Sequence, residues 1–74
     1  MSISIMVNGQ PREVAESTTV TQLLEQLKIE PVRVVVELNL TILKRAQHVS
    51  TVLKEGDRVE VVHFVGGGAE YFGG

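Results

Sequence analysis

The residues whose types and spacing could support chemistry lie at the end of the chain. Five of its seven glycines fall within residues 65–74, first as Gly66, Gly67 and Gly68 and then as the final pair, Gly73 and Gly74. Glycine has no Cβ, so a glycine-rich segment is thin and costs much entropy to fix in one conformation. Residues 66–74 are therefore predicted to form a flexible arm that carries a carboxylate to the active site of another protein. The alternative is a frayed terminus without function.

Composition restricts the classes of protein to which the chain can belong. Its 74 residues allow one small domain, residues 1–65, followed by the arm. A net charge of -2, with Lys and Arg dispersed along the sequence, argues against nucleic-acid binding. The absence of cysteine excludes a disulfide framework and is compatible with the cytoplasm. We find no signal peptide and no run of about 20 apolar residues, so no membrane association is expected.

The two histidines do not form a metal-binding pattern. His48 and His63 lie far apart in a chain that has no cysteine, and neither belongs to an HxxxH spacing. Gly66, Gly67 and Gly68 follow a predicted strand but precede no helix, which argues against a phosphate-binding loop. We therefore expect no metal site and no bound cofactor, and ordinary hydrogen bonds for both imidazole rings.

The first predicted elements are a β-hairpin. Ile3, Ile5 and Val7 alternate with polar or flexible residues, which is typical of a half-buried strand. Asn8 and Gly9 suit the two central positions of a type I′ turn, where φ is positive, and this turn leads into a second strand over residues 10–16. Pro11 cannot donate a ladder hydrogen bond, so the second strand is expected at an edge, with Val14 as its main core residue.

A helix is predicted next. Thr19 can act as its N-cap, and Gln22 can return a hydrogen bond to complete a capping box. One face carries apolar residues at helical spacing, namely Val20, Leu23, Leu24 and Leu27. Pro31 cannot continue a helix, so the helix is expected to end near Lys28.

The remaining sequence predicts three more strands. Residues 32–38 are rich in β-branched side chains and should form a central strand whose inward face carries Val34, Val36 and Leu38. A turn at Asn39 and Leu40 leads to a short strand over residues 41–44. Residues 45–53 show no regular pattern, although Val49 and Leu53 could anchor them to the core. After a turn at residues 54–57, in which Gly56 supplies a positive φ, the last strand covers residues 58–65.

The last strand has two distinct faces. Val59 and Val61 should point into the core, while Val62 and Phe64 should point the other way. An apolar surface next to the arm suggests a docking site for the protein whose active site would receive the arm. The alternative is that residues 45–53 pack over Val62 and Phe64.

The order of these elements predicts an α+β fold. One helix can cover one face of a small mixed sheet of four or five strands. The first and last strands are the most regular apolar runs, so we place them side by side in the middle of the sheet. If the crossover between them is right-handed, they are parallel.

Several segments resemble the sulfur-carrier (ThiS-like) family of thiamine biosynthesis. The similarity covers residues 1–68 and is carried by the Asn8-Gly9 turn, the helix that begins after Thr19, and residues 36–39 and 56–68. It implies a ubiquitin-like β-grasp fold. It also implies a carrier, itself not an enzyme, whose terminal glycine is adenylated and then converted to a thiocarboxylate. The implied partners are an adenylyltransferase of the ubiquitin-activating type, a thiazole synthase, and a cysteine desulfurase or another sulfur donor.

The implied chemistry agrees with the residues present. A carboxylate is a poor electrophile, so attack on it requires activation, for example as an acyl-adenylate from which a sulfur nucleophile displaces AMP. Such a mixed anhydride must be kept from water, and glycines fit a narrow, dry channel. Because the chain has no cysteine, a carrier role leaves its terminus as the attachment point. ATP and Mg²⁺ would be bound by the partner enzyme.

Two residues could form the reactive terminus, Gly68 or Gly74. The sequence continues through Ala69, Glu70, Tyr71 and Phe72 beyond the first glycine cluster and ends in a second pair. At ~3.3 to 3.6 Å per extended residue, Gly68 lies about 10 Å beyond Val65 and Gly74 about 30 Å. We favour Gly74, with Gly73, as the reactive terminus; the alternative is a protease that trims the chain after Gly67 and Gly68. Docking is assigned to Val62, Phe64, Val65 and Gly66.

Other functions use the same arm. Sulfur could pass to molybdopterin, homocysteine, cysteine or tRNA instead of a thiazole. A protein modifier would transfer its activated terminus to lysines, and a plain interaction module would have an inert arm. The sequence favours the thiazole pathway through the resemblance alone.

Overall fold

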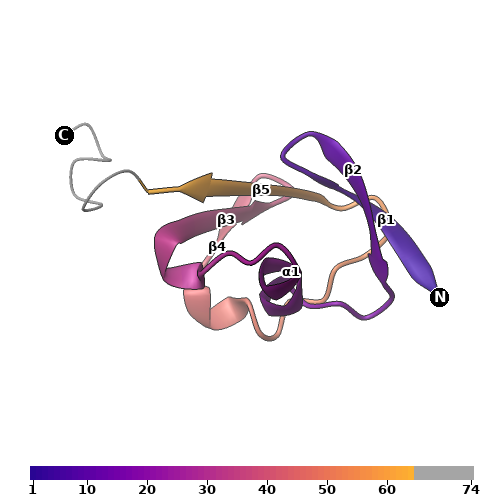
Figure 1. Cartoon of the computed structure of the whole chain (residues 1–74), viewed down its shortest axis with the longest axis horizontal. Coiled ribbons are helices and arrows are strands. Elements are labelled where there is room, and N and C mark those ends of the chain that lie inside the picture. Colours follow the sequence, from indigo (N-terminus) through magenta and orange to yellow (C-terminus); the bar gives the residue numbers. More distant parts are fainter. Residues whose placement is uncertain (65–74) are drawn as a thin grey trace.

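One mixed sheet of five strands forms the framework of residues 1–64, the part of the chain that the computed structural model describes. Its strands are β1 (Ser2–Val7), β2 (Gln10–Ala15), β3 (Val34–Leu38), β4 (Thr41–Leu43) and β5 (Arg58–His63). Their order across the sheet is β2-β1-β5-β3-β4 (Figure 1). β1 and β5 are parallel and the other neighbours are antiparallel, which confirms the predicted arrangement of the first and last strands.

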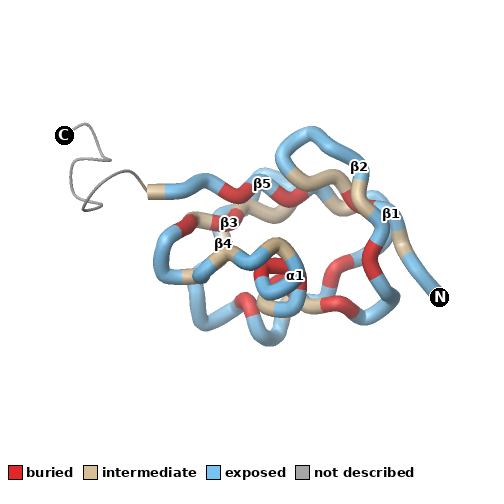
Figure 2. Tube along the Cα trace, in the orientation of Figure 1, coloured by how far each residue is buried: buried red, intermediate tan, exposed pale blue. Residues whose placement is uncertain are grey.

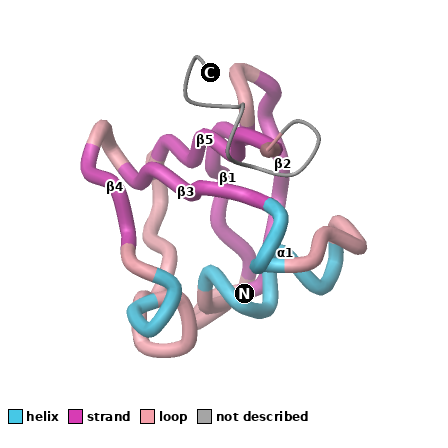
Figure 3. Tube along the Cα trace, turned by 90° about the vertical axis from the view of Figure 1, so that its left-hand side faces the viewer, coloured by secondary structure: helices cyan, strands magenta, loops and turns pink. Residues whose placement is uncertain are grey.

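Helix α1 (Val20–Gln26) and two short 3-10 helices, Pro31–Arg33 and Arg45–Gln47, complete the regular structure of these residues. The helical segments lie on one side of the sheet (Figure 3). A single helix held against a five-stranded mixed sheet is the β-grasp arrangement that the sequence predicts. β3 begins two residues later than predicted, because Pro31–Arg33 form a 3-10 turn instead of extended chain.

The first hairpin forms as predicted. Asn8 and Gly9 have φ values of 49° and 80°, as a type I′ turn requires. β2 lies at the edge of the sheet with Pro11 in it, and Val14 is buried. The local pattern of this segment was sufficient to define its structure.

The start of α1 is confirmed, but its end differs from the prediction. Thr19 accepts a hydrogen bond from the Gln22 N–H at 3.1 Å, and the Gln22 side chain accepts one from the Thr19 N–H at 3.0 Å. The helix ends at Gln26 because Lys28 adopts a left-handed conformation with φ of 60°. The N–H groups of Lys28 and Ile29 then bond to Glu25 and Leu24, the pattern of a Schellman motif. This motif, and not Pro31, ends the helix.

The core lies between the inner face of the sheet and α1 (Figure 2). All the predicted inward residues of the strands and helix contribute, with Leu27, Leu38, Ile3 and Val7 partly buried at its margin. The buried apolar residues are Ile5, Val14, Val20, Leu23, Leu24, Val34, Val36, Leu53, Val59 and Val61. A core built from both ends of the described chain holds β5 in the middle of the sheet.

Residues 45–53 are attached to the start of α1. The Val20 N–H bonds to the Thr51 carbonyl at 3.0 Å, and the Leu53 N–H to the Thr18 carbonyl at 2.8 Å. Leu53 is buried, as predicted, but the prediction for Val49 is wrong because its side chain is 68% exposed. After the 3-10 turn Arg45–Gln47, the inward position is taken by His48, which is only 4% exposed.

His48 departs from the sequence-based expectation in a second way. Neither of its ring nitrogens has a hydrogen-bond partner among residues 1–64, so the expectation of ordinary hydrogen bonds is wrong for this residue. Burial lowers the pKa of His48 from its usual value, and the positive charge of Arg45 lowers it further. The imidazole is therefore accommodated as a neutral group.

We predict that His48 makes the fold sensitive to mild acid. A base whose pKa is lower in the folded state is protonated more readily in the unfolded chain, so stability falls as the pH drops below about 6.5. Urea unfolding between neutral and mildly acidic pH should show a smaller loss of stability in His48→Gln than in the native protein. A separate His63→Gln variant allows the contribution of the second histidine to be subtracted. Equal pH dependence with and without His48 would contradict the prediction.

Candidate functional site

The candidate site is the end of β5, where the described chain stops. β5 lies between β1 and β3, and the Phe64 N–H bonds to the Arg33 carbonyl at 2.9 Å, which extends the pairing with β3 by one step. The predicted reactive and docking glycines, together with Val65, lie outside the described residues; they are Gly66, Gly67, Gly68, Gly73 and Gly74. Of the predicted site residues, the structure places Val62 and Phe64.

The outer face of the sheet carries an apolar surface beside this end. Val62 is 39% exposed, and the cross-strand register sets Val35 of β3 directly beside it. Ile42 of the neighbouring strand β4 is also exposed. Residues 45–53 do not cover Val62, because they bond to the start of α1 on the opposite side of the sheet. The alternative of packing beneath that segment is therefore wrong, and Val62 remains accessible to a partner.

Two acidic residues face each other on the same outer surface. Glu37 of β3 and Glu60 of β5 are cross-strand partners. Like charges directly opposite each other on one sheet face are destabilising. Within residues 1–64, neither carboxylate forms a salt bridge; the salt bridge found there joins Arg33 and Glu30. Arg58 lies on the same face, two residues before Glu60 on β5. The outer surface therefore combines apolar side chains with charges of both signs.

Two asparagines hold β5 from its flanks. Asn8 accepts a hydrogen bond from the Val61 N–H at 2.7 Å through Oδ1, and its Nδ2 donates to the Val61 carbonyl at 3.3 Å. Asn39 accepts from the Arg58 N–H at 2.9 Å and donates to Asp57 at 3.0 Å. Sequence reasoning assigned both asparagines to turns only. Their residue types indicated turns, which their positive φ values confirm, but nothing local identified a contact with β5.

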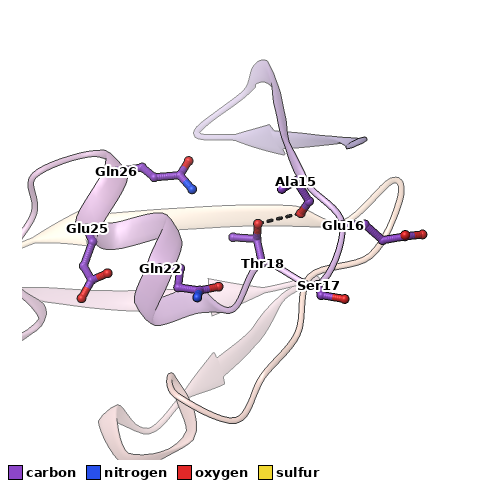
Figure 4. A pocket seen from close by; sticks show the side chains of 7 residues that line it. All are labelled: Ala15, Glu16, Ser17, Thr18, Gln22, Glu25 and Gln26. Atoms are coloured by element: carbon purple, nitrogen blue, oxygen red, sulfur yellow. Dashed lines mark hydrogen bonds between the residues drawn. The ribbon is translucent and has the colours of Figure 1, made fainter. Parts of the chain in front are cut away.

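A surface hollow lies away from this end. It is lined by Ala15, Glu16, Ser17, Thr18, Gln22, Glu25 and Gln26, where β2 leads into α1 (Figure 4). Ala15 is paired with Ser2 at the start of β1, and β1 runs parallel to β5, so the hollow lies near the opposite end of the sheet. The Thr18 hydroxyl donates to the Ala15 carbonyl, so its proton is not directed toward a basic side chain.

Among residues 1–64, no three His, Asp or Glu side chains lie close enough together to bind a metal ion. The helices described there are also too short or too polar to span a bilayer.

The charge repulsion on the outer face leads to a testable prediction. Replacing Glu60 by Gln should increase the free energy of unfolding by about 0.2 to 1 kcal/mol, because it removes a like-charge pair across the strands. The gain should shrink as salt is raised. Urea unfolding at low and high salt measures both effects. Glu25→Gln on the exposed surface of α1 removes the same charge elsewhere; an equal gain from this control would contradict the prediction.

Comparison with known proteins places this geometry in a family. The ThiS family model matches residues 5–68. The crystal structure of the thiamine biosynthesis protein ThiS from Geobacter metallireducens superimposes with a TM-score of 0.78 at 45% identity, over 89% of this chain and 100% of that one. An uncharacterized protein from Porphyra purpurea is 36% identical over 90% of this chain and 94% of its own length.

Two longer proteins contain a similar segment. The thiazole synthase of Magnetococcus marinus is 41% identical over 89% of this chain, and that of Paramagnetospirillum magneticum is 34% identical over 92%. The chain spans about a fifth of the length of each, at 20% and 21%. The match of the family model over most of the sequence, together with the shared fold, shows that the chain belongs to the ThiS family.

Proposed function

We propose that this protein is a sulfur carrier for thiazole formation in thiamine biosynthesis. Membership of the ThiS family is the observation that carries this proposal. A central strand that leads into a glycine-rich end supports it, because the fold then serves to present one carboxylate. In this role the protein is a substrate of other enzymes and is not itself a catalyst.

The proposed reaction takes place at the terminal carboxylate. One carboxylate oxygen attacks the α-phosphate of ATP, and pyrophosphate leaves to give an acyl-adenylate. Hydrosulfide then attacks the acyl carbon and AMP departs, which leaves a thiocarboxylate. Where the nucleophile is a persulfide of the donor, an acyl disulfide forms first, and a second thiol attacks the donor sulfur, so that the thiocarboxylate leaves and the donor becomes a disulfide. The adenylyltransferase supplies the ATP site, the Mg²⁺ and the exclusion of water. The carrier contributes the terminal carboxylate, preceded by glycine whether the reactive residue is Gly74 or Gly68.

The proposed partners follow from the same chemistry and from the relatives. Two relatives named thiazole synthase contain a segment like this chain within a longer protein, which supports a thiazole synthase as the acceptor of sulfur. An adenylyltransferase of the ubiquitin-activating type is proposed as the activating enzyme. A cysteine desulfurase or another donor would provide the sulfur. The outer surface around Val62 and Val35 is proposed as the docking site for the activating enzyme.

Identification of the reactive terminus is the first test. Intact mass spectrometry of protein isolated from its native cells should show the exchange of one oxygen for sulfur at the terminal residue. The same measurement shows whether that residue is Gly74 or, after proteolytic trimming, Gly68. Isopeptide conjugates to lysines without a thiocarboxylate would instead indicate a protein modifier.

Variants of the arm should give matching results. If Gly74 is reactive, deletion of Gly73 and Gly74 abolishes ATP consumption with the cognate adenylyltransferase. If Gly68 is reactive, a variant that ends at Gly68 is adenylated without prior cleavage. The proposal would be overturned if neither the full chain nor this shorter variant caused the adenylyltransferase to consume ATP.

The docking surface gives a separate prediction. Val62→Asp should raise the KM of the carrier for adenylation at least about tenfold, equivalent to about 1.4 kcal/mol, because it puts a charge into an apolar contact. Val49→Asp is the matched control, since Val49 is 68% exposed and lies in the segment attached to α1. Urea unfolding establishes that both variants are folded. Equal KM values for the two variants would contradict docking through Val62.

A further inference from the structure

Arg12 occupies an inward position on the edge strand β2. Directly opposed residues of an antiparallel pair lie on the same face of a sheet, and Arg12 is opposed to Ile5, which is 1% exposed in the core. Two residues further along β2, the equivalent inward position is taken by the buried Val14. Arg12 is half-buried, so its side chain brings a positive charge to the margin of the core.

The guanidinium group of Arg12 is unpaired in residues 1–64. Its Nε is buried and makes no hydrogen bond, and no salt bridge in this part of the chain includes Arg12. Leaving a buried donor without an acceptor costs free energy, and the cost is larger for a charged group. A ligand that supplies an anionic acceptor to this group would therefore bind with a favourable contribution that water does not already provide.

A hollow of about 360 Å³ lies beside Arg12, between the β1–β2 hairpin and the residues that follow α1. We call it the Arg12 hollow. Its apolar lining residues are Val7, Pro11, Leu27 and Ile29, and its polar ones are Asn8, Gln10 and Arg12. The Asn8 carboxamide is already bonded to Val61 through both its oxygen and its nitrogen. Apolar walls with a few polar groups, at a volume of this order, are typical of small-molecule sites.

We propose that the Arg12 hollow binds a small organic molecule that carries one carboxylate on an apolar body. The planar guanidinium of Arg12 pairs with the carboxylate, since its N–H groups match the two carboxylate oxygens. The apolar body lies against Leu27 and Ile29. This site goes beyond the proposed function and does not rest on it, because none of its residues takes part in the reaction proposed for the terminal carboxylate.

The charges around the hollow favour a carboxylate over a phosphate group. Among the residues that line it, Arg12 is the one cation. Leu27 is the C-cap of α1, so the negative end of the helix dipole lies beside the hollow and opposes an anion with two charges. A phosphate monoester carries nearly two negative charges at neutral pH, whereas a carboxylate carries one.

The volume of the hollow indicates the size of the ligand. At about 30 Å³ for each water molecule in the liquid, the hollow corresponds to about a dozen waters, which suits an organic ligand of about ten non-hydrogen atoms. Phenylacetate has this size, one carboxylate and an apolar ring. It therefore serves as the probe, and phenylacetamide serves as its uncharged counterpart of the same shape.

Protection of the sheet edge is the competing explanation of Arg12. Inward-pointing charges on edge strands hinder pairing with other chains. However, β2 also carries Pro11, which cannot donate a ladder hydrogen bond and already protects this edge. Edge protection requires a charge at this position but no affinity for a carboxylate, so ligand binding separates the two explanations.

Isothermal titration of the full chain tests the role of Arg12. The Kd of phenylacetate should be at least about tenfold lower than that of phenylacetamide, because only the carboxylate forms a charged hydrogen bond. Arg12→Gln should raise the Kd of phenylacetate about tenfold and leave that of phenylacetamide unchanged. Arg58→Gln is the matched control, since it removes the same charge from β5 on the outer face. Equal Kd values for the two probes, or equal effects of the two substitutions, would overturn the proposal.

A second measurement uses the native chain and does not depend on whether a variant folds. The aromatic ring of phenylacetate should shift the methyl NMR signals of Leu27 and Ile29, which line the hollow. The methyl signals of Val49 should stay unchanged, because Val49 lies in the exposed segment attached to the start of α1. Unchanged signals of Leu27 and Ile29 at millimolar phenylacetate would overturn the proposal.

Two further experiments distinguish a free ligand from a carboxylate of a protein. Glu70 lies outside the described residues, and tighter binding of phenylacetate by Glu70→Gln than by the native chain would show that the chain's own carboxylate competes for the hollow. Tighter binding of an acetylated and amidated Phe-Asp dipeptide than of phenylacetate would assign the hollow to an acidic side chain of a partner protein. Either result would overturn a small molecule as the occupant.

Discussion

The parallel pairing of β1 and β5 is the constraint on which the rest of the structure depends. It joins the two ends of the described chain through only two residue pairs, Met6 with Arg58 and Val7 with Val59. Forming such a long-range contact costs the entropy of closing the loop between the two strands, so additional hydrogen bonds are needed to stabilise it. Asn8 supplies that support by bonding to Val61, and Asn39 does the same at Arg58 on the other side. The position of Phe64, from which the chain continues, follows from these contacts.

Features determined by a few neighbouring residues could be predicted from the sequence. The Asn8-Gly9 turn and the capping box between Thr19 and Gln22 are local, and both formed as expected. The inward faces of β3 and β5 followed from the alternation of β-branched residues. The adjacency of β1 and β5 required a rule about crossovers as well as a pattern, and it was also confirmed.

The errors arose where tertiary contacts select between local alternatives. Val49 and His48 are neighbours in an irregular segment, and only the attachment of that segment to α1 decides which of them is buried. The left-handed conformation of Lys28 opposes the preference of a non-glycine residue, so the motif that ends α1 was not visible in the sequence, although its end lies within two residues of the predicted position. At the candidate site, Val62 was found from strand alternation, but the contact of Asn8 with Val61 spans most of the chain and had no local signature.

The inner face of the sheet is buried in the core, whereas the outer face is exposed, and this difference links the fold to the proposed function. The ten buried apolar residues are on the inner face, on α1 and, in the case of Leu53, in the segment attached to α1, so the core forms without the outer face. That outer face nevertheless keeps Val62 and Ile42 exposed and sets Glu37 opposite Glu60 at a cost in stability. Features that cost stability and do not contribute to the core are best explained by binding. Because they lie on β5 and its neighbours, a partner that covers them would lie next to the end of the strand from which the proposed reactive segment continues.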